Sequence, residues 1–178
     1  MAIRKIKGEI TGTSPLLMHR FPMEEITAIE KKPREEQAEI AAYRDPDTEE
    51  LYIPGVAFQR CLVAAAVYSK GRGRASLQKP VAASVLVEPE RAGLGVKDYN
   101  IDSRPVVIRA TKGRIIRHRP RLETWSATFT ITYDDELLTK DQLRQVVDDA
   151  GARVGLLDFR PEKKGPFGRF TVTHWEEI

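Results

Sequence analysis

The sequence predicts an α+β fold in which strands and helices follow the order βαββαβ. Period-two alternation of apolar and polar residues indicates strands at both ends of the chain and before the last helix. Apolar residues at helical spacing indicate buried helices after residue 55 and after residue 139. This order is that of the ferredoxin-like fold, which RNA recognition motifs also use. We expect one RRM-like domain over 1–178, with an extra β-hairpin and an acidic helical insertion at about residues 21–47.

The first strand and the insertion come first. Ile6, Gly8 and Ile10 alternate with charged residues over 3–11, which is typical of a half-buried strand. A loop follows, and then the segment 31–44 has a proline, Pro33, near its first turn and acids directly after it. Both features favour a helix start, so we expect a helix here, outside the core.

A buried helix and a strand form the next unit. Ile53-Pro54-Gly55 ends an extended stretch, and Phe58, Leu62, Val63 and Ala66 then recur at helical spacing. The mostly apolar run from Val81 predicts a strand, and residues 91–100 predict a glycine-containing loop.

A hairpin and a strand follow. Val106 to Ile108 form the first arm of the predicted hairpin, Lys112-Gly113 the turn, and Ile115-Ile116 the start of the return. Strict alternation over 125–133 then predicts a strand.

The last helix and strand complete the pattern. Thr139 and Gln142 have the spacing of a capping box, so we expect a helix that starts at Thr139 and stops at Gly151. A glycine-rich loop leads to the final strand, in which Phe170, Val172 and His174 share one face.

Composition excludes several classes of protein. No apolar run approaches the roughly 20 residues that a membrane span needs, and the first residues lack the apolar core of a secretory signal. The single cysteine, Cys61, cannot form an internal disulfide and lies on the apolar side of its helix, where we expect a structural role. We therefore expect a soluble, cytoplasmic protein without membrane contact.

Charge is segregated along the chain. Residues 24–50 carry ten acids and four bases, whereas residues 60–121 carry fourteen bases and four acids. Segregation on this scale is typical of a surface that binds a polyanion, with an acidic surface elsewhere. The alternative is that both clusters are simply solvated faces.

Basic residues beside glycines or in the hairpin are the candidates for phosphate contacts, because glycine lets a backbone approach closely. Phe167 is added because a loop aromatic either stacks on a base or anchors its own loop, and the sequence leaves that choice open. The predicted nucleic-acid contacts are Arg20, Arg60, Lys70, Arg72, Arg74, Arg109, Lys112, Arg114, Arg117, Arg119, Arg160, Lys163, Lys164, Phe167 and Arg169.

Signals for catalysis and cofactors are weak. His19, His118 and His174 are far apart and lack metal-ligand spacing, and no nucleotide-binding fingerprint occurs, so we expect no metal and no cofactor. His19 is the best candidate for an acid or base, because it follows the first strand beside Arg20, where it would meet a bound phosphodiester.

Two segments carry a family resemblance. Asp45-Pro46 precedes a short turn and Ile53-Pro54-Gly55, and Gly155, Gly165, Gly168 and Arg169 lie just before the last strand. Together they resemble the RAMP superfamily, in particular the repeating backbone subunit of CRISPR effector complexes and its relatives on phages and mobile elements. The resemblance implies a ferredoxin-like subunit that binds a guide strand along its backbone.

The chain departs from the family pattern at two places. Relatives follow Ile-Pro-Gly with Ser-Ser, an apolar residue and Lys-Gly, whereas this chain has Val56 to Arg60, so Arg60 would have to replace the lysine from a shifted position. RNA-cutting members carry an aspartate after the first strand, but residues 14–20 contain none. The resemblance therefore implies no cleavage by that route.

These observations favour a non-catalytic protein that binds single-stranded RNA or DNA, with RNA favoured. We expect it to multimerise head to tail along the strand, with other effector-complex subunits as possible partners. Two alternatives stay open. One is a RAMP-type endoribonuclease that uses His19, and the other is a phage-type structural or assembly protein without affinity for nucleic acid.

Overall fold

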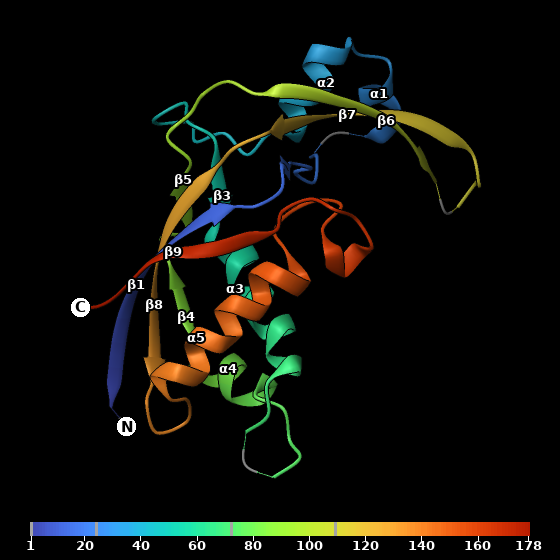
Figure 1. Ribbon diagram of the computed structural model, residues 1–178. Helices are drawn as coiled ribbons and strands as arrows, with labels where there is room; N and C mark the ends of the chain where they lie inside the picture. Colours follow the sequence, from blue (N-terminus) through green and yellow to red (C-terminus); the bar gives the residue numbers. More distant parts are fainter. Residues whose placement is uncertain (1, 24, 72, 109) are drawn as a thin grey trace.

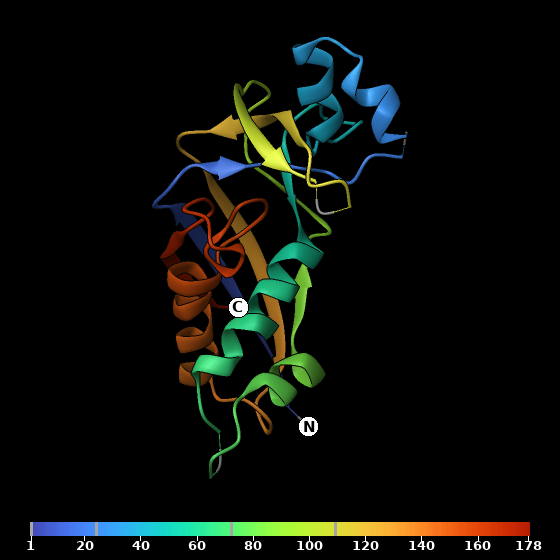
Figure 2. The same ribbon diagram turned by 90° about the vertical axis from the view of Figure 1, so that its right-hand side faces the viewer.

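The computed structural model describes residues 2–23, 25–71, 73–108 and 110–178, and its core is a four-stranded antiparallel sheet (Figure 1). The strands lie in the order β4-β8-β1-β9, with helices α3 and α5 on one face (Figure 2). The core elements are β1 (Ile3–Gly12), α3 (Gly55–Ala65), β4 (Leu86–Glu88), β8 (Ser126–Asp134), α5 (Lys140–Asp149) and β9 (Phe170–Glu177). This βαββαβ arrangement confirms the predicted ferredoxin-like fold.

Apolar residues from the helices and the sheet pack between the two layers. The ring of Phe58 on α3 stacks on Phe129 of β8, with centroids 4.1 Å apart. The predicted capping box is confirmed, because the Gln142 amide donates to Thr139 Oγ1 (3.1 Å) and the Thr139 amide donates to Gln142 Oε1 (2.9 Å). These bonds satisfy two amides at the start of α5.

A second sheet carries the predicted hairpin, which projects beyond the core (Figure 1). Its strands are β2 (Leu16–Leu17), β7 (Arg114–Leu122) and β6 (Asn100–Val107), in the order β2-β7-β6. The hairpin prediction is therefore confirmed, and both arms are longer than predicted.

A short ribbon leads into α3. It pairs β3 (Tyr52–Pro54) with β5 (Arg91–Gly93), so the start of the predicted loop 91–100 is in fact a strand. A Cβ on Gly55 would lie 2.4 Å from the carbonyl oxygen of Pro89. Only glycine fits at this point, which explains the glycine of the Ile-Pro-Gly motif physically.

The acidic segment forms two short helices, α1 (Ile26–Glu30) and α2 (Arg34–Ala41), at the same end as the hairpin (Figures 1 and 2). Helix α2 lies against β7. Arg20 fastens it, since its amide donates to Ala41 O (2.9 Å) and its Nε to Ile40 O (3.2 Å). Glu39 accepts hydrogen bonds from Arg44 and from the hydroxyl of Tyr99 (2.8 Å). These contacts tie the insertion to the rest of the chain.

The strand predicted from Val81 is partly wrong. Residues Gln78–Ser84 form helix α4, and the strand β4 starts only at Leu86. Leu77, Val81 and Val85 are buried at a spacing of four, which is the helical period. A short apolar run is compatible with either structure, and here packing of one helical face decides.

The last helix does not stop at Gly151. It continues as a π-helical turn, η2 (Ala150–Val154), and ends at Gly155, whose φ is +77°. Gly151 is required for a different reason, because a Cβ there would lie 2.1 Å from Phe170 O. Glycine at 151 therefore permits close packing of the helix on β9.

The face prediction for the last strand is wrong beyond Val172. The pairing of β1 with β9 shifts between Glu9 and Ile10, so one extra residue is accommodated on β9. The bulge places Trp175 against the core and leaves His174 exposed. Among the described residues, no helix has the length and apolarity needed to cross a membrane.

Candidate nucleic-acid interface

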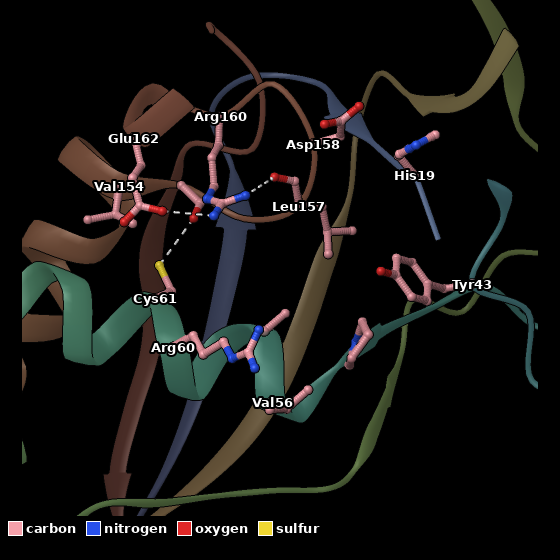
Figure 3. Close-up of a pocket in the computed structure, with 13 residues that line it drawn as sticks. His19, Tyr43, Val56, Arg60, Cys61, Val154, Leu157, Asp158, Arg160 and Glu162 are labelled. Carbon is pink, nitrogen blue, oxygen red and sulfur yellow. Dashed lines mark hydrogen bonds and ion pairs between the residues drawn. The ribbon is translucent and has the colours of Figure 1, made fainter. Parts of the chain in front are cut away.

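A cleft of about 280 Å³ opens between the start of α3, the glycine-rich loop (155–168) and the segment that follows β2 (Figure 3). His19 and Tyr43 lie at one end of the cleft, and Arg160 and Glu162 at the other. Arg60 comes from α3, on the side opposite the loop. The two segments that carry the family resemblance thus meet at this cleft.

The glycine-rich loop has a strained and fully specified shape. Leu157, Phe159 and Lys164 have positive φ values of 63°, 48° and 65°, which side chains rarely adopt. The Phe167 amide donates to Phe159 O (3.1 Å), and a Cβ on Gly165 would lie 1.9 Å from the same oxygen. Such strain persists where the surroundings over-determine it, and it is concentrated at functional sites.

Arg160 is engaged in holding this loop. Its Nη1 donates to Leu157 O and its Nη2 to Glu162 Oε1, both at 2.8 Å (Figure 3). Arg160 therefore shapes the wall of the cleft, and its charge is paired.

Phe167 is a correction to the predicted contacts. Its side chain is only 3% exposed, and the guanidinium groups of Arg104 and Arg121 lie 4.9 and 5.2 Å from its ring centroid. A base has no access to this ring. Phe167 anchors the loop against the hairpin sheet, which decides between the two roles that the sequence left open.

The structure also corrects the prediction that Arg119 contacts nucleic acid. Its side chain is 5% exposed and donates a hydrogen bond to Asp158. It belongs to a cluster around the buried Asp102, which accepts two hydrogen bonds from Arg104 (2.7 and 2.9 Å) and one from Arg121 (3.3 Å). Burial alone would raise the pKa of Asp102, but the bonds to Arg104 and Arg121 and the charge of Arg119 lower it. We call these four residues and Asp158 the Asp102 network.

The Asp102 network also changes the interpretation of residues 60–121, whose excess of bases alone indicates a surface that binds a polyanion. Part of the positive charge in residues 60–121 is neutralised inside the protein rather than offered to a polyanion. The Asp102 network was not predicted from the sequence. One signal for the network is present in the sequence. Asp102 lies directly before a long stretch that contains arginines and no acids, and an arginine that is buried on a strand needs an acidic partner.

Arg20 and Arg117 are half-buried and also serve the fold. Arg20 fastens the insertion, as described above, and Arg117 Nη1 donates to His19 Nε2 (2.7 Å). Because arginine only donates, Nε2 is the acceptor and the ring proton of neutral His19 lies on Nδ1. Nδ1 is buried and has no hydrogen-bond partner among the described residues.

His19 is expected to make stability depend on pH. Burial lowers its pKa below the ordinary value, and the nearby charges of Arg117 and Arg119 act in the same direction, against Asp158. As the pH falls, His19 is therefore protonated in the unfolded chain at a higher pH than in the folded protein. The contribution of His19 should be complete above about pH 6.5 and lost as the pH falls below it.

The measurement is the free energy of unfolding of the wild type and of His19→Gln at about pH 7.5 and about pH 5.5. The wild type should lose more stability than the variant between these values. Equal losses would contradict the assignment.

Four exposed cations on the cleft wall, on the glycine-rich loop or directly after that loop have no ion-pair partner among the residues that the structure describes. They are Arg60, Lys163, Lys164 and Arg169. Two further groups lie elsewhere. Lys112 and Arg114 are at the turn of the hairpin, whereas Lys70 and Arg74 are in the loop after η1 (Ala66–Tyr68), at the opposite end of the molecule (Figures 1 and 2). Arg72 and Arg109 are outside the described residues. The predicted cations thus form three groups, not one surface.

Cys61 lies at the floor of the cleft, where it is buried. Burial raises the pKa of its thiol, and Sγ donates to Gly155 O (3.2 Å). This confirms a structural role for Cys61. In the described part of the chain, no group of three His, Cys, Asp or Glu side chains has a geometry that would hold a metal ion.

Comparison with known proteins identifies the class of fold. No family model and no curated protein matches the sequence. Among solved structures, the chain is similar to one in the cryo-EM structure of the type III-B Cmr-beta bound to cognate target RNA, with a TM-score of 0.60 and 15% identity. The alignment covers 99% of this chain and 61% of that chain, so this protein spans about three fifths of its neighbour's length. A chain of that structure therefore shares the fold of this protein.

Proposed function

We propose that this protein binds single-stranded nucleic acid in the cleft, with RNA favoured over DNA, and does not cut it. The observation that carries the proposal is a set of exposed cations without an ion-pair partner among the described residues, beside a strained loop wall: Arg60 lines the cleft, and Lys163 and Lys164 directly follow its lining residue Glu162. The shared fold with a chain from a complex that contains target RNA supports RNA as the ligand. Phosphate contacts from such cations supply affinity that depends on salt and little on sequence.

A single strand fits the cleft better than a duplex does. A hollow of about 280 Å³ with irregular walls accepts phosphates and sugars of one strand, whereas a duplex needs a broad surface. The open face of the core sheet is a poor alternative. Lys5, Lys7 and Thr130 lie there, and among the described residues no phenylalanine, tyrosine or tryptophan side chain lies on that face to stack on a base.

The contacts of His19 support a non-catalytic role. Its Nε2 accepts from Arg117 and its Nδ1 is buried, so neither nitrogen is positioned to take a proton from a bound strand. The test is an RNA cleavage assay. If the wild type cuts RNA and His19→Ala does not, the protein is an endoribonuclease and this part of the proposal is wrong.

We also propose that copies assemble head to tail along the strand, with subunits of an effector complex as further partners. The hairpin projects from the body and exposes Val107 (60%) and Ile116 (59%) beside the cations of its turn. Exposed apolar and basic groups on a projecting hairpin suit contact with the acidic insertion of a neighbouring copy.

Replacing Lys163 and Lys164 by glutamine should weaken RNA binding and its salt dependence. Each lost phosphate contact makes the negative slope of log K against log salt shallower by about 0.7, so the double variant should have a slope that is shallower by about 1.4. The measurement is the affinity for a short RNA, by fluorescence anisotropy, at about 50 mM and about 200 mM salt.

The matched control is the double change Lys5→Gln and Lys7→Gln, which removes the same charge from the open sheet face. It should leave the salt slope unchanged. If this control weakens binding and the loop variant does not, the strand lies on the sheet and the proposal for the cleft is wrong.

A further inference from the structure

Two carboxylates line the cleft, and phosphate binding gives them no role. They belong to Asp158 and Glu162. Asp158 Oδ2 accepts a hydrogen bond from Arg119. Glu162 Oε1 accepts one from Arg160. The other two oxygens, Asp158 Oδ1 and Glu162 Oε2, accept no hydrogen bond among the described residues. Phosphate oxygens only accept hydrogen bonds, so these acceptors fit a ligand group that donates.

Tyr43 carries a free hydroxyl at the same end of the cleft as His19. Figure 3 shows this hydroxyl pointing into the cleft, and it has no hydrogen-bond partner among the described residues. The ring is held in place, since it packs edge-on against Tyr52 with the centroids 5.7 Å apart. Burial raises the pKa of the hydroxyl, and the nearby charge of Asp158 acts in the same direction. The hydroxyl therefore stays protonated, and it can both donate and accept.

Apolar side chains lie beside these polar groups. Pro54, Val56 and Ala57 line the cleft from the start of α3, and Leu157 lines it from the glycine-rich loop. Val56 is 59% exposed, so its side chain has surface that a ligand can cover. The cleft thus offers an apolar surface next to a hydroxyl and a free carboxylate oxygen. A sugar ring fits this combination, with its C–H groups on the apolar surface and a hydroxyl on the polar groups.

We propose that Tyr43 and Asp158 bind the 2′-hydroxyl of one ribose, and that this contact makes the cleft select RNA over DNA. The inference rests on the proposed function and adds a specificity-determining residue, Tyr43, to it. Within a strand, the 2′-hydroxyl is the hydrogen-bond donor of the sugar–phosphate backbone, and DNA lacks it. In this contact the 2′-hydroxyl donates to Asp158 Oδ1 and accepts from the Tyr43 hydroxyl, while Arg60 is available for the adjoining phosphate. A deoxyribose would leave both protein groups without a partner, which weakens binding.

The first experiment is a scan with single 2′-deoxy substitutions. A short RNA that binds one copy of the protein is synthesised with a deoxyribose at each position in turn, and the affinities are measured at fixed salt. One position should lose about fivefold in affinity, and the others much less. A 2′-fluoro group, which cannot donate, should cause a similar loss at that position.

Two results of the scan would overturn the ribose contact alone. One is a flat profile with normal, salt-dependent RNA binding. The other is a 2′-fluoro strand that binds like unmodified RNA, because the cleft would then select the sugar conformation and not the hydrogen bond. Absence of binding to every strand would overturn the proposed function as well.

Tyr43→Phe tests the residue itself, because it removes the hydroxyl and keeps the ring that packs on Tyr52. The variant should bind unmodified RNA about fivefold more weakly, and it should bind DNA like the wild type. It should also lose less affinity than the wild type does at the sensitive position, since the two changes remove the same contact.

Tyr52→Phe is the matched control, because Tyr52 does not line the cleft. It should bind RNA and DNA like the wild type. If Tyr43→Phe weakens the binding of RNA and DNA equally, Tyr43 only shapes the cleft and its role in selecting RNA is wrong.

Discussion

Asp102→Ala should lower the free energy of unfolding by about 3 to 5 kcal/mol, because it removes the one acid that Arg104, Arg119 and Arg121 share. Arg119 is 5% exposed and would keep one acidic partner among the described residues, Asp158. The change should also loosen the glycine-rich loop, since Arg104 and Arg121 cover Phe167. Urea unfolding followed by circular dichroism measures the loss.

The control for Asp102→Ala is Glu123→Ala. Glu123 also pairs with Arg121, but its side chain is 54% exposed, and an exposed pair contributes at most about 1 kcal/mol. Acid should have the matching effect. The pKa of Asp102 is lowered in the folded state, so its contribution should be complete above about pH 4 and lost as the pH falls further. Similar losses for both variants would contradict a central role for Asp102.

Gly168→Ala is expected to destabilise the protein by about 3 to 5 kcal/mol, the sum of backbone strain and a steric clash. The φ of Gly168 is +78°, and an added Cβ would lie 2.0 Å from Leu156 O. That oxygen is backbone, so it cannot move without disturbing the loop. Differential scanning calorimetry of the variant should show the loss as a lower Tm, and RNA affinity should decrease with it.

Gly95→Ala is the matched control for Gly168→Ala. The φ of Gly95 is +71°, but nothing lies within 4 Å of the position of its Cβ. Gly95→Ala should lower the free energy of unfolding by only about 1 to 2 kcal/mol, which is the energy needed to hold an alanine in the left-handed conformation. The difference between the two variants isolates the close approach of the loop strands. Equal costs would show that the loop tolerates a side chain at residue 168.

Local patterns in the sequence were sufficient to predict most of the core. Alternation over 125–133, the helical spacing after Gly55 and the capping box at Thr139 each act within one element, so neighbours in sequence decide them. The errors arose where distant segments decide. The helix passes residue 151, where glycine lets it pack closely on Phe170, and the bulge on β9 lies in its pairing with β1.

The candidate site was predictable only in part. Glycines and cations pointed to the loop and to Arg60, and the structure brings these to one cleft. Charge alone did not reveal which cations are already paired. Arg119 and Arg160 were candidates by residue type, yet the partners that occupy them, Asp158 and Glu162, are fixed by the fold. The burial of Phe167 likewise depends on arginines from another sheet.

The most direct test of the account is binding of the wild-type protein to a length series of single-stranded RNA, single-stranded DNA and duplex at about 50 mM and about 200 mM salt. The account predicts that RNA binds most tightly, that bound copies increase in steps with strand length, and that affinity falls steeply with salt. Equal, salt-insensitive behaviour towards all three, or oligomers that bind no nucleic acid, would contradict it and favour a structural protein.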